Sequence, residues 1–236
     1  MIPRQNLFGQ PIGPAVDNWS ARPRPSRTDM VGRYCRLEPV NLQRHEIELF
    51  AAYREAPDGR DWTYLFSSDR PENPADFHTY LAKLEKSDDP LHFTIIDSEA
   101  GSAVGTAALM RIEPAHGVIE VGGITFSPRL KKTRAATESM YLMMHRAFDE
   151  LGYRRYEWKC DSLNAPSRAA ATRYGFTYEG IFRQAIVYKG RSRDTAWFSI
   201  TDVEWLRVRA AFEAWLDPAN FNADGQQKRR LSDLRG

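Results

Sequence analysis

The stretch from Val118 to Phe176 constrains the fold most, because its pattern switches between strand and helix. The segment VIEVGGITF (118–126) is a nearly continuous apolar run, which is typical of a buried strand. The segment YRRYEWKCD (153–161) alternates like a second strand, and NAPSRAAATRYGF (164–176) is typical of a turn leading into a helix. Between the strands, apolar residues recur at helical spacing: Met140, Met143, Met144, Ala147, Phe148 and Leu151. The stretch therefore predicts a β-α-β unit.

The connection between the first strand and the first helix of this unit is basic. It carries Arg129, Lys131, Lys132 and Arg134. A right-handed crossover places the helix N-terminus, with its free N–H groups, at the carboxyl end of the preceding strand. The sequence therefore predicts an anion-binding site at this edge of the sheet.

Composition indicates an ordinary soluble protein. Charged residues make up 27% of the 236 residues and hydrophobic ones 42%, and the net charge of +2 is too small to indicate nucleic-acid binding by itself. The sequence lacks an apolar run near the roughly 20 residues that cross a bilayer, and its start lacks the apolar core of a signal peptide. Cys35 and Cys160 both fall in predicted strands, so reduced buried thiols are expected. We expect a cytoplasmic protein without membrane contact, and we expect no metal.

The chain is predicted to form one α/β domain with two irregular ends. Residues 1–30 carry several prolines and arginines and predict an irregular arm, with Phe8 and Trp19 as candidate docking residues. Residues 31–216 form the domain, and the polar tail 217–236 is expected to be frayed. The sequence leaves open whether the arm packs on its own chain or on a neighbour, and a homodimer is one expectation.

The remaining elements follow from caps and alternation. Asn41 and Asn73 are predicted N-caps of helices that reach residues 56 and 86, and Thr201 with Glu204 forms a capping box for a last helix. Strands are predicted at 33–40, 91–97, 102–114, 181–189 and 194–200. The last two strands are expected to form a hairpin whose tip is the basic segment GRSR.

This order of elements, together with three motifs, resembles the GNAT acyltransferases, and in particular the branch of ribosomal-protein-alanine N-acetyltransferases. The motifs are FSPRLKKTRAATESM, ending in Ala136-Thr137-Glu138; Asn164 and Ser167 followed by Gly175-Phe176; and the hairpin EGIFRQAIVYKGRSRDTAWFSI. The resemblance covers residues 33–216. It implies the GNAT acyl-CoA N-acyltransferase fold, with a mixed, largely antiparallel sheet and helices on both faces.

The resemblance also implies acetyl-CoA as the acyl donor. Backbone N–H groups near the end of the central strand would polarise the thioester carbonyl, the basic loop and helix start would hold the pyrophosphate, and the second helix would bind the pantetheine arm. The implied coenzyme-binding residues are Ile124, Thr125, Phe126, Lys131, Lys132, Thr133, Arg134, Ala135, Ala136, Thr137, Asn164 and Ser167.

The loop departs from the family pattern at two positions. Where the family has glycines, this chain has Lys132 and Arg134. A side chain is disfavoured at a position that needs a positive φ, and it blocks close approach of a ligand to the backbone. We favour a loop of different shape whose basic side chains bind phosphate directly over a loop that binds the coenzyme weakly.

Glu120 is the candidate general base, because it lies on the central strand where this branch often has a glutamate. The alternative is a solvent-facing carboxylate paired with an arginine such as Arg111. His116 is a rival base with a suitable ordinary pKa, although a turn histidine is more often solvated.

The proton donor to the leaving thiolate is less clear from the sequence. The tyrosine that many family members use falls on Ala171, and Tyr174 is expected to point elsewhere on its helix. Ser162 or Ser167 is then the remaining donor. Ser167 and Asn164 could equally serve as helix-capping residues. Cys160 is not needed, because direct transfer requires no nucleophile on the protein.

Three aromatic residues between the early helices, Trp62, Tyr64 and Phe66, are candidates for the wall of the acceptor site or for core packing. Arg191 and Arg193 are expected in a solvated hairpin tip, with a role in substrate capture as the alternative. The sequence predicts an N-acetyltransferase that acts on a primary amine of a small molecule or protein N-terminus. The alternatives are a non-catalytic acyl-CoA-binding module and, more distantly, a basic nucleic-acid-binding protein.

Overall fold

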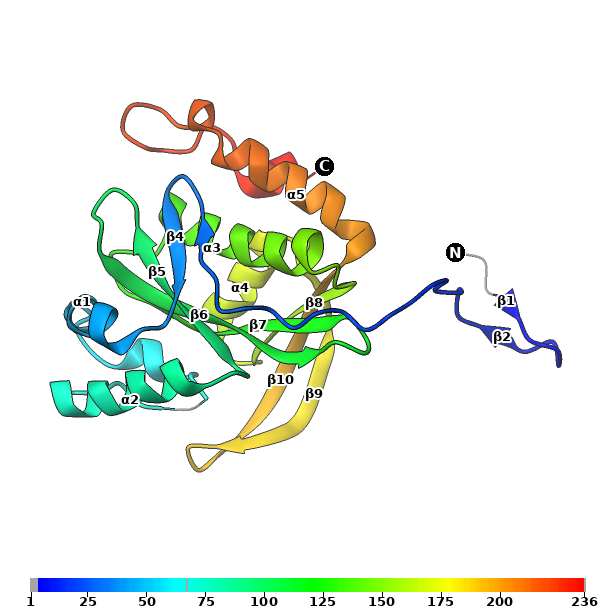
Figure 1. The fold of residues 1–236 in the computed structure, drawn as a ribbon, viewed down its shortest axis with the longest axis horizontal. Helices are drawn as coiled ribbons and strands as arrows, with labels where there is room; N and C mark the ends of the chain where they lie inside the picture. Colours follow the sequence, from blue (N-terminus) through cyan, green and yellow to red (C-terminus); the bar gives the residue numbers. More distant parts are fainter. Residues whose placement is uncertain (1–3, 67, 236) are drawn as a thin grey trace.

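The computed structural model describes residues 4–66 and 68–235. It is built on an eight-stranded sheet with the order β3-β4-β5-β6-β7-β8-β10-β9 (Figure 1). The strands are β3 (Met30–Val31), β4 (Cys35–Pro39), β5 (Leu91–Asp97), β6 (Ala103–Glu113), β7 (Val118–Phe126), β8 (Arg155–Asp161), β9 (Thr177–Tyr188) and β10 (Arg191–Thr201). Neighbouring strands are antiparallel except for β7 and β8, which run parallel. The predicted mixed sheet is confirmed.

Helices cover both faces of the sheet, as predicted. They are α1 (Leu42–Arg54), α2 (Pro74–Lys86), α3 (Arg134–His145), α4 (Ala165–Tyr174) and α5 (Asp202–Leu216). The side chains of Asn41 and Asn73 cap α1 and α2 by accepting backbone N–H groups in the first turn, and α5 starts with the predicted capping box. Among the described residues, no helix is long and apolar enough to span a membrane.

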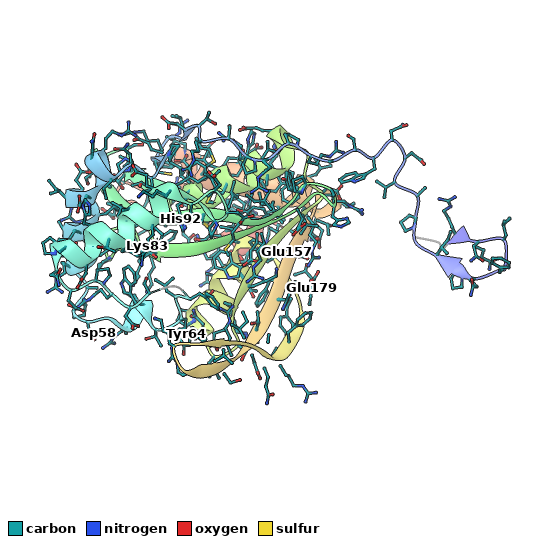
Figure 2. The ribbon with its side chains drawn as sticks, turned by 60° about the horizontal axis from the view of Figure 1, so that its bottom comes forward. Asp58, Tyr64, Lys83, His92, Glu157 and Glu179 are labelled. Atoms are coloured by element: carbon teal, nitrogen blue, oxygen red, sulfur yellow. The ribbon has the colours of Figure 1, made fainter. Side chains whose placement is uncertain are left out.

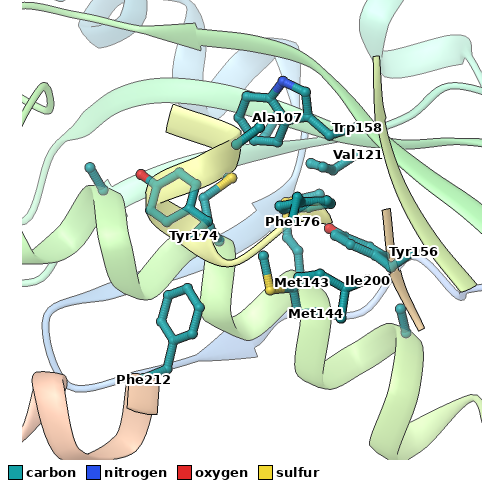
Figure 3. Packing of buried hydrophobic residues seen from close by; sticks show 14 of the residues in the cluster. Ala107, Val121, Met143, Met144, Tyr156, Trp158, Tyr174, Phe176, Ile200 and Phe212 are labelled. Carbon is teal, nitrogen blue, oxygen red and sulfur yellow. The ribbon is translucent and has the colours of Figure 1, made fainter. Parts of the chain in front are cut away.

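Two hydrophobic clusters join the helices to the sheet. The larger one packs α3 and α5 onto one face, where Met143 and Met144 lie near Tyr156 and Ile200, and Phe212 stacks on Tyr174 with ring centroids 6.1 Å apart (Figure 3). The smaller one packs α1 and α2 onto the other face. Both cysteines are free and buried, as predicted. The stripe of apolar residues that the sequence predicted along α3 therefore faces the core.

The parallel pair β7–β8 is joined over only part of its length. Register partners run from Val118 opposite Arg155 to Val121 opposite Trp158. β7 continues to Phe126 and β8 to Asp161, and in the described chain these later residues are not register partners. Gly122 and Gly123 stand where the strands part: a Cβ on Gly122 would lie 2.3 Å from Met110 Sδ, and Gly123 has φ +56°. The central sheet therefore opens into a gap between its two middle strands.

The β9–β10 hairpin differs from the prediction at its tip. The turn is formed by Lys189 and Gly190, both with positive φ, which is the geometry of a tight two-residue hairpin turn. Arg191, directly after the turn, is exposed as predicted, whereas Arg193 lies inside β10 rather than in a solvated tip. A register irregularity between Arg193 and Thr195 alters the strand locally, and Arg193 is buried.

The N-terminal arm is tied to the domain by its second half. A small hairpin of β1 (Arg4–Gln5) and β2 (Pro11–Ile12) projects away from the body (Figure 1). Trp19 docks, since its indole N–H donates to Ala115 O at 2.8 Å and the Arg22 guanidinium lies 4.4 Å from its ring centroid. Phe8, by contrast, is exposed. Docking of the arm on a neighbouring chain stays a prediction.

The C-terminal tail, expected to be frayed, is packed instead. Phe221 and Leu231 are buried in the larger cluster, and Phe221 contacts Trp215 edge to face with ring centroids 5.1 Å apart. Arg235 donates to Arg173 O at 2.7 Å, which ties the end of the chain to α4. The prediction was wrong because two apolar residues within a polar segment are enough to anchor it when a partly covered helix pair offers them a surface.

Candidate active site

A cavity of about 1940 Å³ passes through the gap between β7 and β8. One end is lined by the basic loop and the start of α3, and the other end by α2, β5 and the hairpin β9–β10. In Figure 2, Lys83 and His92 mark this second end, and Tyr64 lies near the hairpin. The cavity thus connects the two faces of the sheet.

The first end combines a helix N-terminus with cations. Thr133 caps α3, because its side chain accepts the N–H of Ala136 at 3.0 Å. The N–H groups of Arg134 and Ala135 stand at the first positions of the helix, where helical geometry supplies no acceptor. Lys131 and Lys132 are exposed and line the same space. This end is therefore suited to an anion such as a phosphate.

The two positions that depart from the glycine pattern have different explanations. Lys132 has φ +63°, so the loop keeps a left-handed residue at this point although the residue is not glycine. Arg134 is the first residue of α3 and needs no unusual backbone, and its guanidinium stacks over Tyr34 at 4.8 Å from the ring centroid. Both side chains line the cavity. The expectation of a loop with a wholly different shape is therefore wrong at Lys132, whose backbone is the one a glycine would take.

Glu138, the last residue of the Ala-Thr-Glu motif, has a structural role. Its carboxylate accepts the backbone N–H groups of Arg33, Tyr34 and Cys35 at 2.9, 2.5 and 2.8 Å. A buried carboxylate with several backbone donors is strongly held. The motif therefore fixes the start of β4 against α3, which positions the helix N-terminus.

A buried ionic network forms the floor of the second end. Glu120 on β7 is only 3% exposed, and its carboxylate lies 2.9 Å from Lys159 Nζ and 3.1 Å from Arg111 Nε. Lys159 also contacts Glu157 at 2.6 Å, and its ammonium lies 3.9 Å from the centroid of the Trp197 ring. The pairing with Arg111 that the sequence left open is present. The carboxylate, however, is buried rather than solvent-facing.

Burial sets the protonation of two groups beside this floor. It raises the pKa of Glu120 above its ordinary value, although Lys159 and Arg111 act in the opposite direction. It lowers the pKa of His92 to about 4, assisted by Arg27. His92 lines the cavity next to Gly123, and its Nδ1 has no hydrogen-bond partner among the described residues. The sequence analysis missed His92, because a lone histidine in a buried strand carries no signal.

Comparison with known proteins agrees with this geometry. The model of an acetyltransferase (GNAT) domain matches residues 36–177. A GCN5-related N-acetyltransferase from Brucella melitensis has 51% sequence identity and a TM-score of 0.91, over 93% of this chain and 99% of that one. A GNAT-family acetyltransferase from Chromobacterium violaceum has 39% identity and a TM-score of 0.75, over 83% and 97% of the two chains. The chain belongs to the GNAT acetyltransferase family.

The fold also extends to distant members. A microcin C7 self-immunity acetyltransferase in complex with acetyl-CoA and AMP has 19% identity and a TM-score of 0.61, over 72% of this chain and 93% of that one. No curated protein matches the chain. GNAT enzymes take the acetyl group from acetyl-CoA, so the family assigns the cavity a donor but not an acceptor.

All the sequence-predicted coenzyme residues of this GNAT protein line the cavity: Ile124, Thr125, Phe126, Lys131, Lys132, Thr133, Arg134, Ala135, Ala136, Thr137, Asn164 and Ser167. Asn164 also caps α4, since its side chain accepts Ser167 N–H at 3.1 Å. Asn164 is therefore a helix cap, the second role that the sequence left open, and its side-chain oxygen already accepts a hydrogen bond. No group of three or more metal-binding side chains occurs among residues 4–66 and 68–235.

The candidate proton donors differ in whether they line the cavity. Ser167 Oγ accepts the Trp158 indole N–H at 3.0 Å and faces the cavity. Ser162 does not line the cavity, so it is too remote to donate there. Ala171 is buried in the core. The expectation that Tyr174 points elsewhere is wrong, because it lies on the cavity wall. Burial raises the pKa of its hydroxyl, so that it stays protonated at neutral pH.

The aromatic cluster divides between core and cavity. Trp62 is 3% exposed and packs edge to face on Tyr53, with ring centroids 5.6 Å apart, and it does not line the cavity. The substrate-binding prediction is therefore wrong for Trp62, because α1 and α2 close over it. Tyr64 and Phe66 do line the cavity, and Phe66 stacks on Tyr188 with ring planes 7° apart. The exposed His116 lies outside the cavity, so the structure does not support it as a base.

The loop that carries Tyr64 and Phe66 is fastened across the second end. Lys189 Nζ donates to Trp62 O at 2.8 Å and to Ser68 O at 2.9 Å, and Tyr64 Oη donates to Leu163 O at 3.3 Å. These bonds connect the α1–α2 loop to the tip of β9–β10 and to the β8–α4 turn. The loop therefore covers part of the cavity, and its Asp61 also reaches Lys131 of the basic loop at 2.5 Å.

The sequence analysis also missed part of the coenzyme end. Arg33, Arg173, Lys228 and Arg230 line the cavity beside α3. Arg173 donates to Thr137 Oγ1 at 3.2 Å, which places a cation next to the first turn of that helix. No sequence signal marks them, because they come from the start of β4, from α4 and from the tail, which only the fold brings together.

Proposed function

We propose that this protein transfers an acetyl group from acetyl-CoA directly to the primary amine of a small molecule. The observation that carries the proposal is the single cavity that joins a basic helix N-terminus to a buried carboxylate, Glu120, through the gap between β7 and β8. A donor that enters from one face and an acceptor that enters from the other would meet inside the sheet.

The donor side would bind the coenzyme by charge and by backbone. The pyrophosphate fits the start of α3, where Lys132 and the first N–H groups of the helix line the cavity, with Lys131 beside them in an ion pair with Asp61. The pantetheine arm fits the edge of β7 beyond Val121, where β8 no longer pairs with it. An extended ligand can satisfy such backbone groups as an added strand would. The thioester carbonyl would then lie near the N–H groups of residues 124–126, which could stabilise the developing oxyanion.

The acceptor side would remove a proton from the incoming ammonium. Glu120 is the proposed base, acting directly or through a water, and its raised pKa makes the carboxylate a better proton acceptor than an exposed glutamate. Lys159 and Arg111 keep it ionised and in place. His92 is the second candidate, since its lowered pKa keeps the imidazole neutral at neutral pH. The attack forms a tetrahedral intermediate, and its collapse releases the coenzyme thiolate and the N-acetylated amine.

The leaving thiolate would take a proton from Ser167 or Tyr174. The Ser167 oxygen already accepts the Trp158 N–H, so its own proton remains free for donation. The Tyr174 hydroxyl is protonated because burial raises its pKa. Ser167→Ala and Tyr174→Phe separate the two, because the true donor is the one whose loss lowers kcat.

The covered acceptor end favours a small amine over a protein N-terminus. Tyr64 and Phe66 form an aromatic wall, and the loop that carries them is fastened by Lys189 to the opposite hairpin. The ribosomal-protein branch, which the sequence resembles, includes enzymes for both kinds of acceptor. Within that branch, we place this chain among those that modify small molecules.

The test is acetyl-CoA-dependent release of free CoA thiol with a panel of primary amines, alongside calorimetric measurement of acetyl-CoA binding. General-base catalysis is worth 10²–10⁴-fold, so Glu120→Gln is expected to lower kcat by about 100-fold or more while acetyl-CoA still binds. Glu113→Gln, at an exposed glutamate of β6 that does not line the cavity, is the matched control and keeps its activity. Acetyl-CoA binding without turnover on any amine would favour the non-catalytic module instead.

A further inference from the structure

Arg193 is a buried cation that the proposed acetyl transfer does not use. It is 8% exposed and lines the cavity from β10, the strand that pairs with β8 on the side away from β7. The irregular register between Arg193 and Thr195 and the early turn at Lys189–Gly190 place it inside the strand instead of at the tip. It therefore faces the cavity from the side of the aromatic wall.

The Arg193 guanidinium has no ion-pair partner in the described part of the chain, although the buried Asp161 carboxylate lines the same cavity. No carboxylate forms an ion pair with Arg193 among residues 4–66 and 68–235, and its Nε is buried without a hydrogen-bond partner there. The nearby carboxylate of Asp161 is engaged by Tyr188 Oη at 2.7 Å and by Leu163 N–H at 2.9 Å. By contrast, the half-buried Arg155 pairs with both Glu157 and Glu179.

An arginine side chain carries its positive charge in proteins, so this charge needs either solvent or an anion. A buried charge without a partner is destabilising, so such a site favours a ligand that supplies the opposite charge. The coenzyme phosphates fit the opposite end of the cavity, at the start of α3. The anion that pairs with Arg193 would then come from the acceptor.

The surroundings favour a carboxylate as that anion. A guanidinium and a carboxylate are both planar and form two parallel hydrogen bonds. The Arg193 guanidinium lies 5.9 Å from the centroid of the Tyr188 ring, and Phe66 stacks on the same ring. The exposed Lys83 lines the same end and adds positive potential at the mouth. A carboxylate on a small acceptor can therefore pair with Arg193 inside the cavity, beside Tyr64 and Phe66.

We infer that the acceptor is a small amino carboxylate, an amino acid or a close relative, whose carboxylate binds Arg193 while its amine reaches the acetyl group beside Glu120. This inference rests on the proposed acetyl transfer and narrows it to one substrate class. Arg193 is thus a specificity-determining residue, and it takes no part in the bond that forms between the amine nitrogen and the acetyl carbon.

The experiment compares acceptors in matched pairs that differ only in the carboxylate, such as phenylalanine with phenethylamine and methionine with 3-(methylthio)propylamine. The expected kcat/KM is about 100-fold higher for the carboxylate member of the preferred pair, because a site built for a polar group rejects the analogue that lacks it. Phosphonate analogues of the same amines form a third arm, and the inference is overturned if they exceed the carboxylates.

Arg193→Gln is expected to lower kcat/KM for the carboxylate acceptor by about 100-fold, mainly through KM, and to leave the decarboxylated amine nearly unchanged. Arg193→Lys should retain part of the preference. Arg183→Gln, an exposed arginine on the same hairpin, is the matched control and keeps wild-type values. An equal loss on both members of a pair would show a merely structural role and overturn the inference.

Two further readouts separate this inference from other roles of the residue. Arg193→Gln should keep or raise the Tm of the ligand-free protein, because it removes an uncompensated charge, whereas loss of a structural arginine would lower it. Acetyl-CoA affinity should not change, and a tenfold loss would assign Arg193 to the coenzyme instead. If decarboxylated amines are acetylated best, the inference fails while the acetyltransferase proposal stands. If no amine is acetylated, the proposed function fails as well.

Discussion

The two ends of the cavity are built in opposite ways. At the coenzyme end, the residues from Lys131 to Thr137 are consecutive, and the cationic side chains at the start of this run are exposed. At the acceptor end, His92, Glu120, Lys159 and Arg193 come from four different strands, and all four side chains are buried. The same cavity thus joins a local motif to a site that exists only in the folded sheet.

The difference has a physical origin. A phosphate can be held by exposed cations and backbone N–H groups, because solvent hydrates these charges and screens the repulsion between them. A proton-transfer site needs shifted pKa values, and these require burial, where each charge must find a partner. The acceptor end should therefore respond to substitution with large changes in stability. The coenzyme end should respond with small changes in stability and salt-dependent changes in affinity.

Lys159→Met is the strongest test of this contrast. It leaves the buried carboxylates of Glu120 and Glu157 without the ammonium that lies between them. The free energy of unfolding should fall by about 3 to 5 kcal/mol, toward the lower figure because Arg111 and Arg155 remain. Urea unfolding measures the change. A loss below about 1 kcal/mol would mean that the ionic network contributes little to stability, and the two ends of the cavity would then not differ in this respect.

His92 tests the same end through pH. Its pKa is about 4 in the folded protein and 6.5 ordinarily, so between these values the unfolded chain binds more protons. The free energy of unfolding should therefore fall as the pH is lowered from 6.5, by about 3 kcal/mol near pH 4. In His92→Gln this part of the decline should disappear. His116→Gln, in an exposed turn, is the control, and an identical decline in all three proteins would refute the assignment to His92.

Lys132 gives the smallest expected effect, at the coenzyme end. Lys132→Gly relieves a positive φ and should raise the free energy of unfolding by about 0.5 to 1 kcal/mol. It should also weaken acetyl-CoA binding by about fivefold at low salt, and by less at high salt, because an exposed charge is screened. Lys132→Ala should lose the same affinity without the gain in stability. If the affinity of both variants equals that of the wild type, Lys132 does not contact phosphate.

Much of this protein could be predicted from the sequence. The strand and helix periodicities, the caps at Asn41 and Asn73 and the β-α-β unit all indicated the observed elements, because each depends on residues near one another in the chain. The coenzyme loop was predicted for the same reason. The errors came where distant segments meet: the packed tail, the core position of Trp62 and the inward position of Arg193.

The sequence by itself determined the fold class and the Lys131–Thr137 part of the donor end, since a run of consecutive residues carries both the helix start and its charges. The other cations of the donor end, which come from Arg33, α4 and the tail, were placed there by the fold. Only the tertiary structure decided the acceptor end. Burial of Glu120, the lowered pKa of His92 and the missing partner of Arg193 depend on which strands lie side by side and on what the α1–α2 loop covers. Desolvation is a property of surroundings, and the surroundings of a residue in a sheet are set mainly by other parts of the chain.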